Sequence, residues 1–283
     1  MTRMRHHGVG DLIAERFELQ EPLGAGRTGT VWRARDLLLE REVVLKEVRP
    51  TAEEDPDQSA VLRMRVLREA RALAKVQHAN VVANREVVDQ KPYPWLVMEL
   101  IVGRSLRELL LAGPLAAART ARIGLDVLAA LHAAHDAEVL HRDVKPDNVL
   151  IRADGAAMLT GFGKATVGGA QAVAVSVCGR VTGSLEYTAP EQLRGGEIGP
   201  AADMWSLGMV LYVCVEGDTA MRRDWARQRL SAVREQPPPP MTRAGALAPL
   251  IAALLDPQPE LRPSATRLSA RLRAAAEQKP GTR

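Results

Sequence analysis

The chain has 283 residues, of which 46% are hydrophobic and 25% charged, an ordinary balance for a globular protein with a sizeable core. Its net charge of +4 comes from 38 basic and 34 acidic residues, and this small excess does not predict a nucleic-acid-binding surface. The most apolar stretch, Met204 to Val215, is interrupted by Ser206 and Gly208 and is too short to span a membrane.

The start of the chain is basic, but no apolar segment of a secretory signal follows it. The two cysteines, Cys178 and Cys214, lie far apart and in no metal-ligand spacing. We therefore expect a cytoplasmic protein with inert thiols.

Strand patterns dominate the first part of the chain. Phe17 to Val48 alternates apolar and polar residues with glycines at the turns, which predicts antiparallel strands. The polar segment Thr51 to Ser59 predicts a loop, and the apolar spacing of Val61 to Val76 predicts an amphipathic helix. Two further strands are predicted over Val81 to Val88 and over Trp95 to Ile101.

After Gly103 the pattern becomes helical. The predicted helices are Ser105 to Leu111, Ala117 to Ala134, Ala248 to Leu255 and Ser264 to Ala275. Strands with one helix, followed by mostly helices, predict an α+β fold of two lobes.

The glycines Gly24, Gly26 and Gly29 lie between two predicted strands. A glycine-rich turn lets backbone N–H groups approach phosphates closely, although glycines also make plain hairpins, and this segment alone leaves both open. No helix follows and no Lys-Ser/Thr pair ends the segment, which excludes the dinucleotide-binding and P-loop motifs.

The decisive motif is His141-Arg142-Asp143-Val144-Lys145-Pro146-Asp147-Asn148, which places an acid, a base and an amide in one loop before an apolar strand. With the glycines and with Lys46 in a predicted strand, it resembles the catalytic apparatus of eukaryotic-type protein kinases, most closely the bacterial serine/threonine kinases. The resemblance extends from Phe17 to Leu272 and includes Ala189-Pro190-Glu191, Asp203 and Arg262.

This resemblance implies a bilobal protein-kinase fold, with a small β-rich N-lobe carrying one helix and a larger α-helical C-lobe. The implied boundaries are an N-terminal extension over 1–16, an N-lobe over 17–98, a hinge over 99–103, a C-lobe over 104–272 and a tail over 273–283. It also implies that Glu191 pairs with Arg262 and that Asp203 braces the catalytic loop.

The resemblance further implies that the chain binds ATP and transfers its γ-phosphate to protein serine or threonine hydroxyls. Asp143 would accept or orient the hydroxyl proton, Lys145 would steady the γ-phosphate, and Asn148 would bind magnesium. Glu69 would orient Lys46 toward the α- and β-phosphates. The implied ATP-binding residues are Leu23, Gly24, Gly26, Gly29, Val31, Lys46, Met98 as gatekeeper, Glu99, Ile101 and Leu150.

One position departs from the family. Where the family has Asp-Phe-Gly, this chain has Gly161-Phe162-Gly163, so the carboxylate that chelates magnesium between the β- and γ-phosphates is missing. Neither Asp154, which is typical of a turn, nor Asp147, which should point away, replaces it. Loss of one preorganised electrostatic stabiliser costs about 10²–10³ in rate, so we expect weakened catalysis with Mg²⁺, or with Mn²⁺ in its place.

Two other functions stay open at this point. The glycine favours a pseudokinase, acting as a nucleotide-binding scaffold or regulatory module. A small-molecule phosphotransferase of the same fold is disfavoured by the Ala-Pro-Glu motif and by the length of the activation segment.

Within the activation segment, Ser176 and Thr182 are candidate phosphorylation sites for pairing with Arg142, and they serve equally well as ordinary loop hydroxyls. The implied partners are protein substrates, with no nucleic acid and no membrane span. The resemblance also implies that a dimer could form through the N-lobe.

Overall fold

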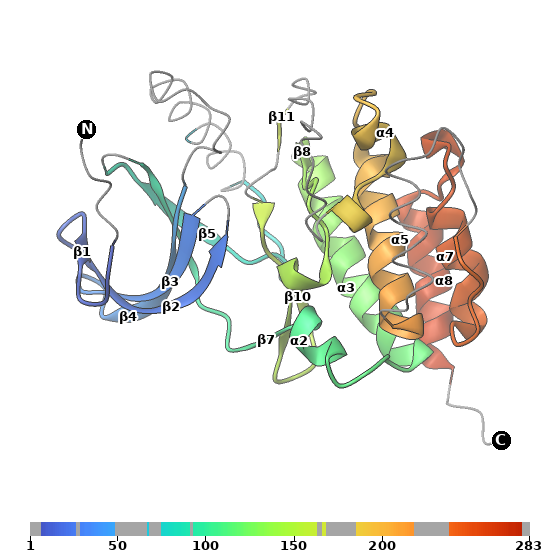
Figure 1. The fold of residues 1–283 in the computed structure, drawn as a ribbon, viewed down its shortest axis with the longest axis horizontal. Helices are drawn as coiled ribbons and strands as arrows, with labels where there is room; N and C mark the ends of the chain where they lie inside the picture. Colours follow the sequence, from blue (N-terminus) through green and yellow to red (C-terminus); the bar gives the residue numbers. More distant parts are fainter. Residues whose placement is uncertain are drawn as a thin grey trace. The chain divides into compact units, whose positions relative to one another are not determined.

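The computed structural model describes residues 7–26, 29–48, 67, 75–90, 93–162, 166–167, 185–217 and 238–278. Most of the predicted helix Val61 to Val76 lies outside these residues, as do Glu69, Ser176 and Thr182. The chain divides into two compact units, residues 1–77 with 82–101 and residues 78–81 with 102–283 (Figure 1).

The first unit is built on a six-stranded antiparallel sheet in the order β1-β2-β3-β4-β6-β5. Its strands are β1 (Leu12–Ile13), β2 (Phe17–Gly26), β3 (Gly29–Asp36), β4 (Arg41–Glu47), β5 (Asn84–Val88) and β6 (Trp95–Glu99). Strand β5 begins three residues later than predicted, because Val81 belongs to the second unit and forms a parallel bridge there with Leu159.

One face of this sheet carries the core of the first unit. Because successive side chains of a strand point to opposite faces, Val43 and Leu45 of β4 lie on the same face as their neighbours Ala34 and Val97. The buried cluster on this face consists of Ile13, Phe17, Leu19, Trp32, Ala34, Val43, Leu45, Trp95 and Val97. The residues between them in sequence are therefore directed to the other face.

The second unit is mainly helical. Its helices are α2 (Leu106–Leu110), α3 (Ala117–Asp136), α4 (Pro190–Leu193), α5 (Pro200–Glu216), α7 (Ala248–Leu254) and α8 (Ala265–Glu277). Its strands are β7 (Gly103–Ser105), β8 (Val139–Leu140), β9 (Val149–Arg152), β10 (Ala157–Leu159) and β11 (Thr166–Val167), in the sheets β10-β9-β7 and β11-β8.

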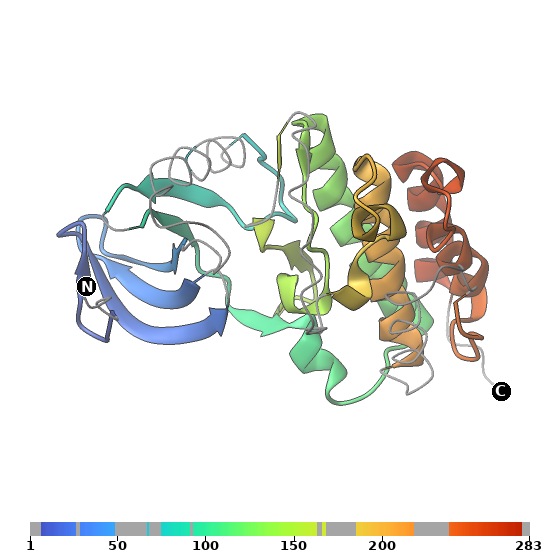
Figure 2. The same cartoon turned by 45° about the horizontal axis from the view of Figure 1, so that its top comes forward.

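Helix α5 explains the most apolar stretch of the sequence. It is buried from Ala202 to Glu216, and α3, α5 and α8 run side by side in both views (Figures 1 and 2). The approach is close at Gly208, where an added Cβ would lie 2.7 Å from Leu254 Cβ of α7. In the described part of the chain, no helix is long and apolar enough to span a membrane.

A strand-built unit and a helical unit agree with the predicted α+β fold. The helix starts also follow from the sequence: Ser105 caps α2 through the Glu108 backbone N–H, and Ser264 caps α8 through that of Arg267. Both serines stand one residue before the helix that each begins.

Candidate active site

Three of the predicted nucleotide-binding side chains lie on one face of the first sheet. Lys46 in β4 is the cross-strand neighbour of Val31 in β3, and Val44 is the neighbour of Met98 in β6. Cross-strand neighbours share a face, and alternate residues of a strand do too. Val31, Lys46 and Met98 are thus placed together, opposite the core.

The glycine-rich segment forms the end of the β2–β3 hairpin, where Gly26 pairs with Gly29 and Gly24 with Val31. Gly29 has φ +129°, and a Cβ there would overlap the Glu47 carbonyl, so the close approach of β4 itself requires glycine. A Cβ at Gly24 would meet no atom within 4 Å, so packing does not require glycine there. Leu23, beside it, is half-exposed.

At the end of β6, the Glu99 backbone N–H donates to the Ala83 carbonyl at 3.0 Å, and the Glu99 carboxylate pairs with Arg85 at 3.0 Å. Ile101 is half-buried. In the second unit, Leu150 lies in β9 and is likewise half-buried. The roles of these residues in adenine binding stay predictions.

The loop that carries the decisive motif is held by one buried carboxylate. Asp203 of α5 accepts hydrogen bonds from the backbone N–H of His141 at 2.9 Å and from that of Arg142 at 2.8 Å. Its third partner is His135 Nε2, at 2.8 Å. Burial alone would raise the pKa of Asp203, but hydrogen bonding and the charge of His135 outweigh it and lower the pKa. The predicted bracing role of Asp203 agrees with this geometry.

These bonds hold a backbone that would otherwise be unfavourable. Arg142 has φ +63°, a left-handed conformation that non-glycine residues adopt at a cost of about 1–3 kcal/mol. The carboxylate of Asp203 fixes the two peptide N–H groups that lead into that bend, and His141 Nδ1 accepts from the Asp143 N–H that follows it. The next residue, Asp143, is positioned by the same bend.

His141 connects this loop to the segment that contains Gly161. Its Nε2 lies 2.9 Å from the Thr160 carbonyl, and its Nδ1 accepts from the Asp143 backbone N–H at 3.2 Å. This pattern assigns the proton to Nε2 and leaves the ring neutral. Complete burial accordingly lowers the pKa of His141. The ring also packs against Phe162, with 4.3 Å between ring centroids.

The three predicted catalytic-loop groups are in direct contact. Lys145 Nζ lies 3.1 Å from Asp143 Oδ2. Asn148 Nδ2 donates to the Asp143 backbone carbonyl at 2.7 Å and lies 3.2 Å from Asp143 Oδ2. A carboxylate held in this way can accept a hydrogen bond from a substrate hydroxyl and orient it.

The β9–β10 hairpin brings Asn148 and Gly161 together. Leu159 pairs with Val149, and the Thr160 N–H donates to the Asn148 carbonyl at 2.9 Å, so the residues that precede β9 and follow β10 are neighbours. Gly161 has φ +87°. A Cβ at this position would lie 2.5 Å from Asn148 Oδ1 and 2.6 Å from Asn148 Nδ2.

The residues present do not match the family's magnesium site. Of the two side chains that would hold the metal, Asn148 supplies one amide oxygen and Gly161 supplies none. Within the described ranges, no three His, Cys, Asp or Glu side chains cluster as metal ligands. Asp154 accepts from the Ala156 N–H in a turn, and Asp147 pairs with Arg107 at 3.3 Å, so neither replaces the missing carboxylate.

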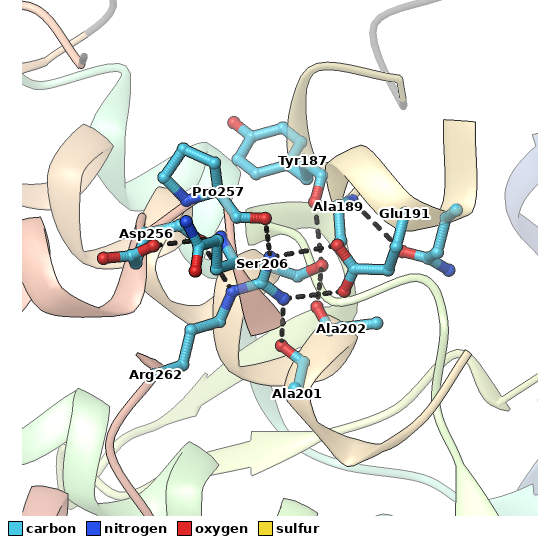
Figure 3. Close-up of polar contacts among 11 residues, drawn as sticks. Tyr187, Ala189, Glu191, Ala201, Ala202, Ser206, Asp256, Pro257 and Arg262 are labelled. Carbon is cyan, nitrogen blue, oxygen red and sulfur yellow. Dashed lines mark hydrogen bonds and ion pairs between the residues drawn. The ribbon is translucent and has the colours of Figure 1, made fainter. Parts of the chain in front are cut away.

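Glu191 of the Ala-Pro-Glu motif pairs with Arg262, as predicted (Figure 3). The Arg262 guanidinium forms a bidentate pair with the Glu191 carboxylate, at 2.6 and 2.9 Å. It also donates to the backbone carbonyls of Ala201, Asp256 and Pro257. The Arg262 side chain is 1% exposed, so this pair is internal to the unit.

A protein kinase domain model matches residues 17–271, which is most of the chain. The chain therefore belongs to the protein kinase family, and the predicted bilobal kinase fold is confirmed.

Among its relatives is the serine/threonine-protein kinase PknL of Mycobacterium bovis, 37% identical over 226 residues that cover 78% of this chain and 55% of that protein. PknB of Mycolicibacterium smegmatis is 34% identical over 249 residues, covering 86% of this chain and 39% of that protein. The chain thus spans about half, or less, of the length of these relatives.

Sequence reasoning missed His135, the third partner of Asp203. A signal for it existed, because a buried aspartate needs several donors and His135 lies in the last turn of α3, six residues before His141. It also missed the ion pair between Arg107 and Asp147.

Proposed function

We propose that the chain is a serine/threonine protein kinase that binds ATP and transfers its γ-phosphate to protein hydroxyls, with metal-dependent catalysis weakened by Gly161. The observation that carries the proposal is the contact of Asp143, Lys145 and Asn148 in a loop fixed by Asp203. These contacts persist although the carboxylate at position 161 is missing, which supports a chain that still catalyses the transfer.

In this proposal, Gly24, Gly26, Gly29 and Lys46 bind the phosphates of ATP, and Met98, Glu99 and Ile101 bind its base. Asp143 accepts the proton of the substrate hydroxyl. The hydroxyl oxygen attacks the γ-phosphorus, and the bond from the γ-phosphorus to the leaving ADP breaks. Lys145 stabilises the charge of the transferred phosphoryl group. Its place two residues after Asp143 favours serine and threonine over tyrosine.

Protein substrates are favoured over small molecules by the buried Glu191–Arg262 pair, which anchors the Ala-Pro-Glu motif. Phosphorylation of Ser176 or Thr182, pairing with Arg142, is part of the same proposal, as are a cytoplasmic location and a dimer through the first unit.

A second candidate is a pseudokinase that binds nucleotide as a scaffold or regulatory module. It is favoured by the one position where the site departs from the family, the glycine that leaves a single amide oxygen for a metal.

A radiolabelled phosphotransfer assay distinguishes the two, with Mg²⁺ and then Mn²⁺, on the native chain and on Asp143→Asn. Asp143→Asn keeps the shape of the side chain and removes the base, so it defines the background. Incorporation by the native chain above that background supports the kinase. Equal incorporation by the two, with a gain in Gly161→Asp, would instead establish the pseudokinase.

A further inference from the structure

Residues 7–13, here called the strap, form one edge of the first unit's sheet and are anchored by their own contacts. Ile13 is fully buried in the core of that unit, and the His7 ring packs edge-on against Trp95, with 5.1 Å between ring centroids. The main chain of the strap pairs with Leu19 of β2, whose N–H donates to it at 3.0 Å and whose carbonyl accepts from it at 2.7 Å. The strap therefore binds its own sheet as a separate strand would.

The turn that joins the strap to β2 is strained. It is closed by the Arg16 N–H, which donates to the Ile13 carbonyl at 3.1 Å, and its two central residues are Ala14 and Glu15. Their φ values are +51° and +57°, so both are left-handed. Turns of this kind ordinarily carry glycine, asparagine or aspartate, because the Cβ of other residues comes too close to the following carbonyl oxygen. In the part of the chain that the structure describes, no other two consecutive non-glycine residues have positive φ.

We propose that Ala14 and Glu15 are the hinge of a strand exchange, in which two copies of this chain each bind the strap of the other. The exchanged dimer keeps the contacts of Ile13 with the core and of His7 with Trp95, now made between copies. It also releases the left-handed residues of both hinges, and short hinge connections under strain favour exchange of this kind. The inference specifies the form of the proposed dimer through the first unit, and it depends on no catalytic step.

Opening the hinge also has a cost. The turn loses the hydrogen bond that closes it, and the Ala14 N–H loses its bond to the Gln90 side chain. Association further restricts the translation and rotation of two molecules. Because only the last of these costs depends on concentration, we expect closed monomers in dilute protein and exchanged dimers in concentrated protein.

The first test is a disulfide between the strap and β2. Leu12 and Glu18 are directly opposite each other, and the bond from the Leu19 N–H to the Asp11 carbonyl flanks them, which is the pattern of a non-hydrogen-bonded pair. Side chains of such a pair lie close enough for a disulfide. Leu12→Cys and Glu18→Cys are introduced together in a Cys178→Ser background. The protein is incubated without nucleotide at low and at high concentration, oxidised, and separated on a denaturing, non-reducing gel.

The gel distinguishes exchange from every other arrangement. In a closed monomer the disulfide lies within one chain, whereas in the exchanged dimer it joins two chains. We expect a covalent dimer whose fraction increases with concentration, above the background of chance cross-links that Leu12→Cys alone defines. Disulfides only within single chains would overturn the proposal, even if size-exclusion chromatography showed a dimer, because that dimer would be side by side. Free thiols in both positions after oxidation would also overturn it, because the strap would then not pair with β2.

The second test changes the hinge and has a matched control in the same sheet. Glu15→Gly removes the strain of one hinge residue from the closed monomer, and this relief counts once for each of the two chains. The dissociation constant of the dimer should therefore rise by about 10²-fold. Glu40 is also an exposed, left-handed glutamate, with φ +50°, in the turn between β3 and β4. Glu40→Gly relieves the monomer and the dimer equally and should leave the dissociation constant unchanged.

Equal dissociation constants for Glu15→Gly and Glu40→Gly would overturn the role of the hinge. Both tests use the protein without nucleotide, so a failure of ATP binding or of phosphotransfer leaves their results standing.

Discussion

Breaking the Glu191–Arg262 pair should destabilise the second unit strongly. Arg262 is 1% and Glu191 12% exposed, so neither charge is solvated by bulk water if its partner is removed. Removing one partner of a buried ion pair costs about 3–5 kcal/mol, because the other charge stays buried without compensation. Arg262→Ala also leaves the backbone carbonyls of Ala201 and Asp256 without this donor.

At about 2–4 °C per kcal/mol, this loss corresponds to a fall in Tm of roughly 6–20 °C. Glu191→Gln keeps the size of the side chain but leaves the buried Arg262 charge without its counter-charge, so it should also cost about 3–5 kcal/mol. The double variant should cost less than the sum of the two, because its second change removes an already unpaired group.

The assay is urea unfolding followed by far-UV circular dichroism, with Arg85→Ala as the control. Arg85 and Glu99 also form an arginine–glutamate pair, but their side chains are 45% and 38% exposed, and we expect a cost of at most about 1 kcal/mol. If Arg262→Ala costs no more than Arg85→Ala, burial does not set the strength of the pair and the reasoning fails.

Three further predictions follow from buried groups. Because the pKa of His141 lies below its unfolded value of about 6.5, only the unfolded chain gains that proton as the pH falls. The free energy of unfolding should thus decrease from about pH 7 to pH 5, and less so in His141→Gln; equal slopes would contradict the assignment. Gly208→Ala should lower Tm, because its Cβ would lie 2.7 Å from Leu254 Cβ, whereas an unchanged Tm would show that α5 and α7 separate easily. Burial raises the pKa of Cys214 to about 12, so in a Cys178→Ser background iodoacetamide should label it only in denaturant, and rapid labelling of the native protein would contradict its burial.

Local patterns predicted much of the fold because the spacing of apolar residues reflects which face of each helix or strand is buried. Alternation over Phe17 to Val48 gave the β2, β3 and β4 strands, since one face of that sheet is core. The serines at 105 and 264 marked helix starts because their hydroxyls satisfy free N–H groups. The start of β5 was predicted too early, because the apolar Val81 makes its bridge with Leu159, outside this sheet.

The sequence predicted which residue types form the site but not how they contact one another. The missing carboxylate at Gly161 is visible in the sequence, whereas the close approach of the Asn148 side chain to that position is not. That contact depends on the β9–β10 register and on a left-handed backbone, which bring together residues 13 positions apart. The contact of His135 with Asp203 is likewise long-range, since it joins the last turn of α3 to the first turn of α5.

The position of Asn148 beside Gly161 changes what Gly161→Asp is expected to do. The new side chain would restore a carboxylate but must also move Asn148, so its first effect on the apo protein should be a lower Tm than that of the native chain. An unchanged Tm in the apo variant would show that Asn148 yields without cost. A gain in phosphotransfer would have to overcome that rearrangement.

The most direct test of the central claim is a thermal-shift titration of the native chain with ATP, once with excess Mg²⁺ and once with a chelator. A kinase site that holds the phosphates through glycine N–H groups and Lys46, and that lacks the family's metal carboxylate, should be stabilised by ATP in both conditions. We expect similar shifts with and without metal. No shift in either condition would contradict nucleotide binding, and a shift that needs Mg²⁺ would contradict the conclusion that the metal site is incomplete.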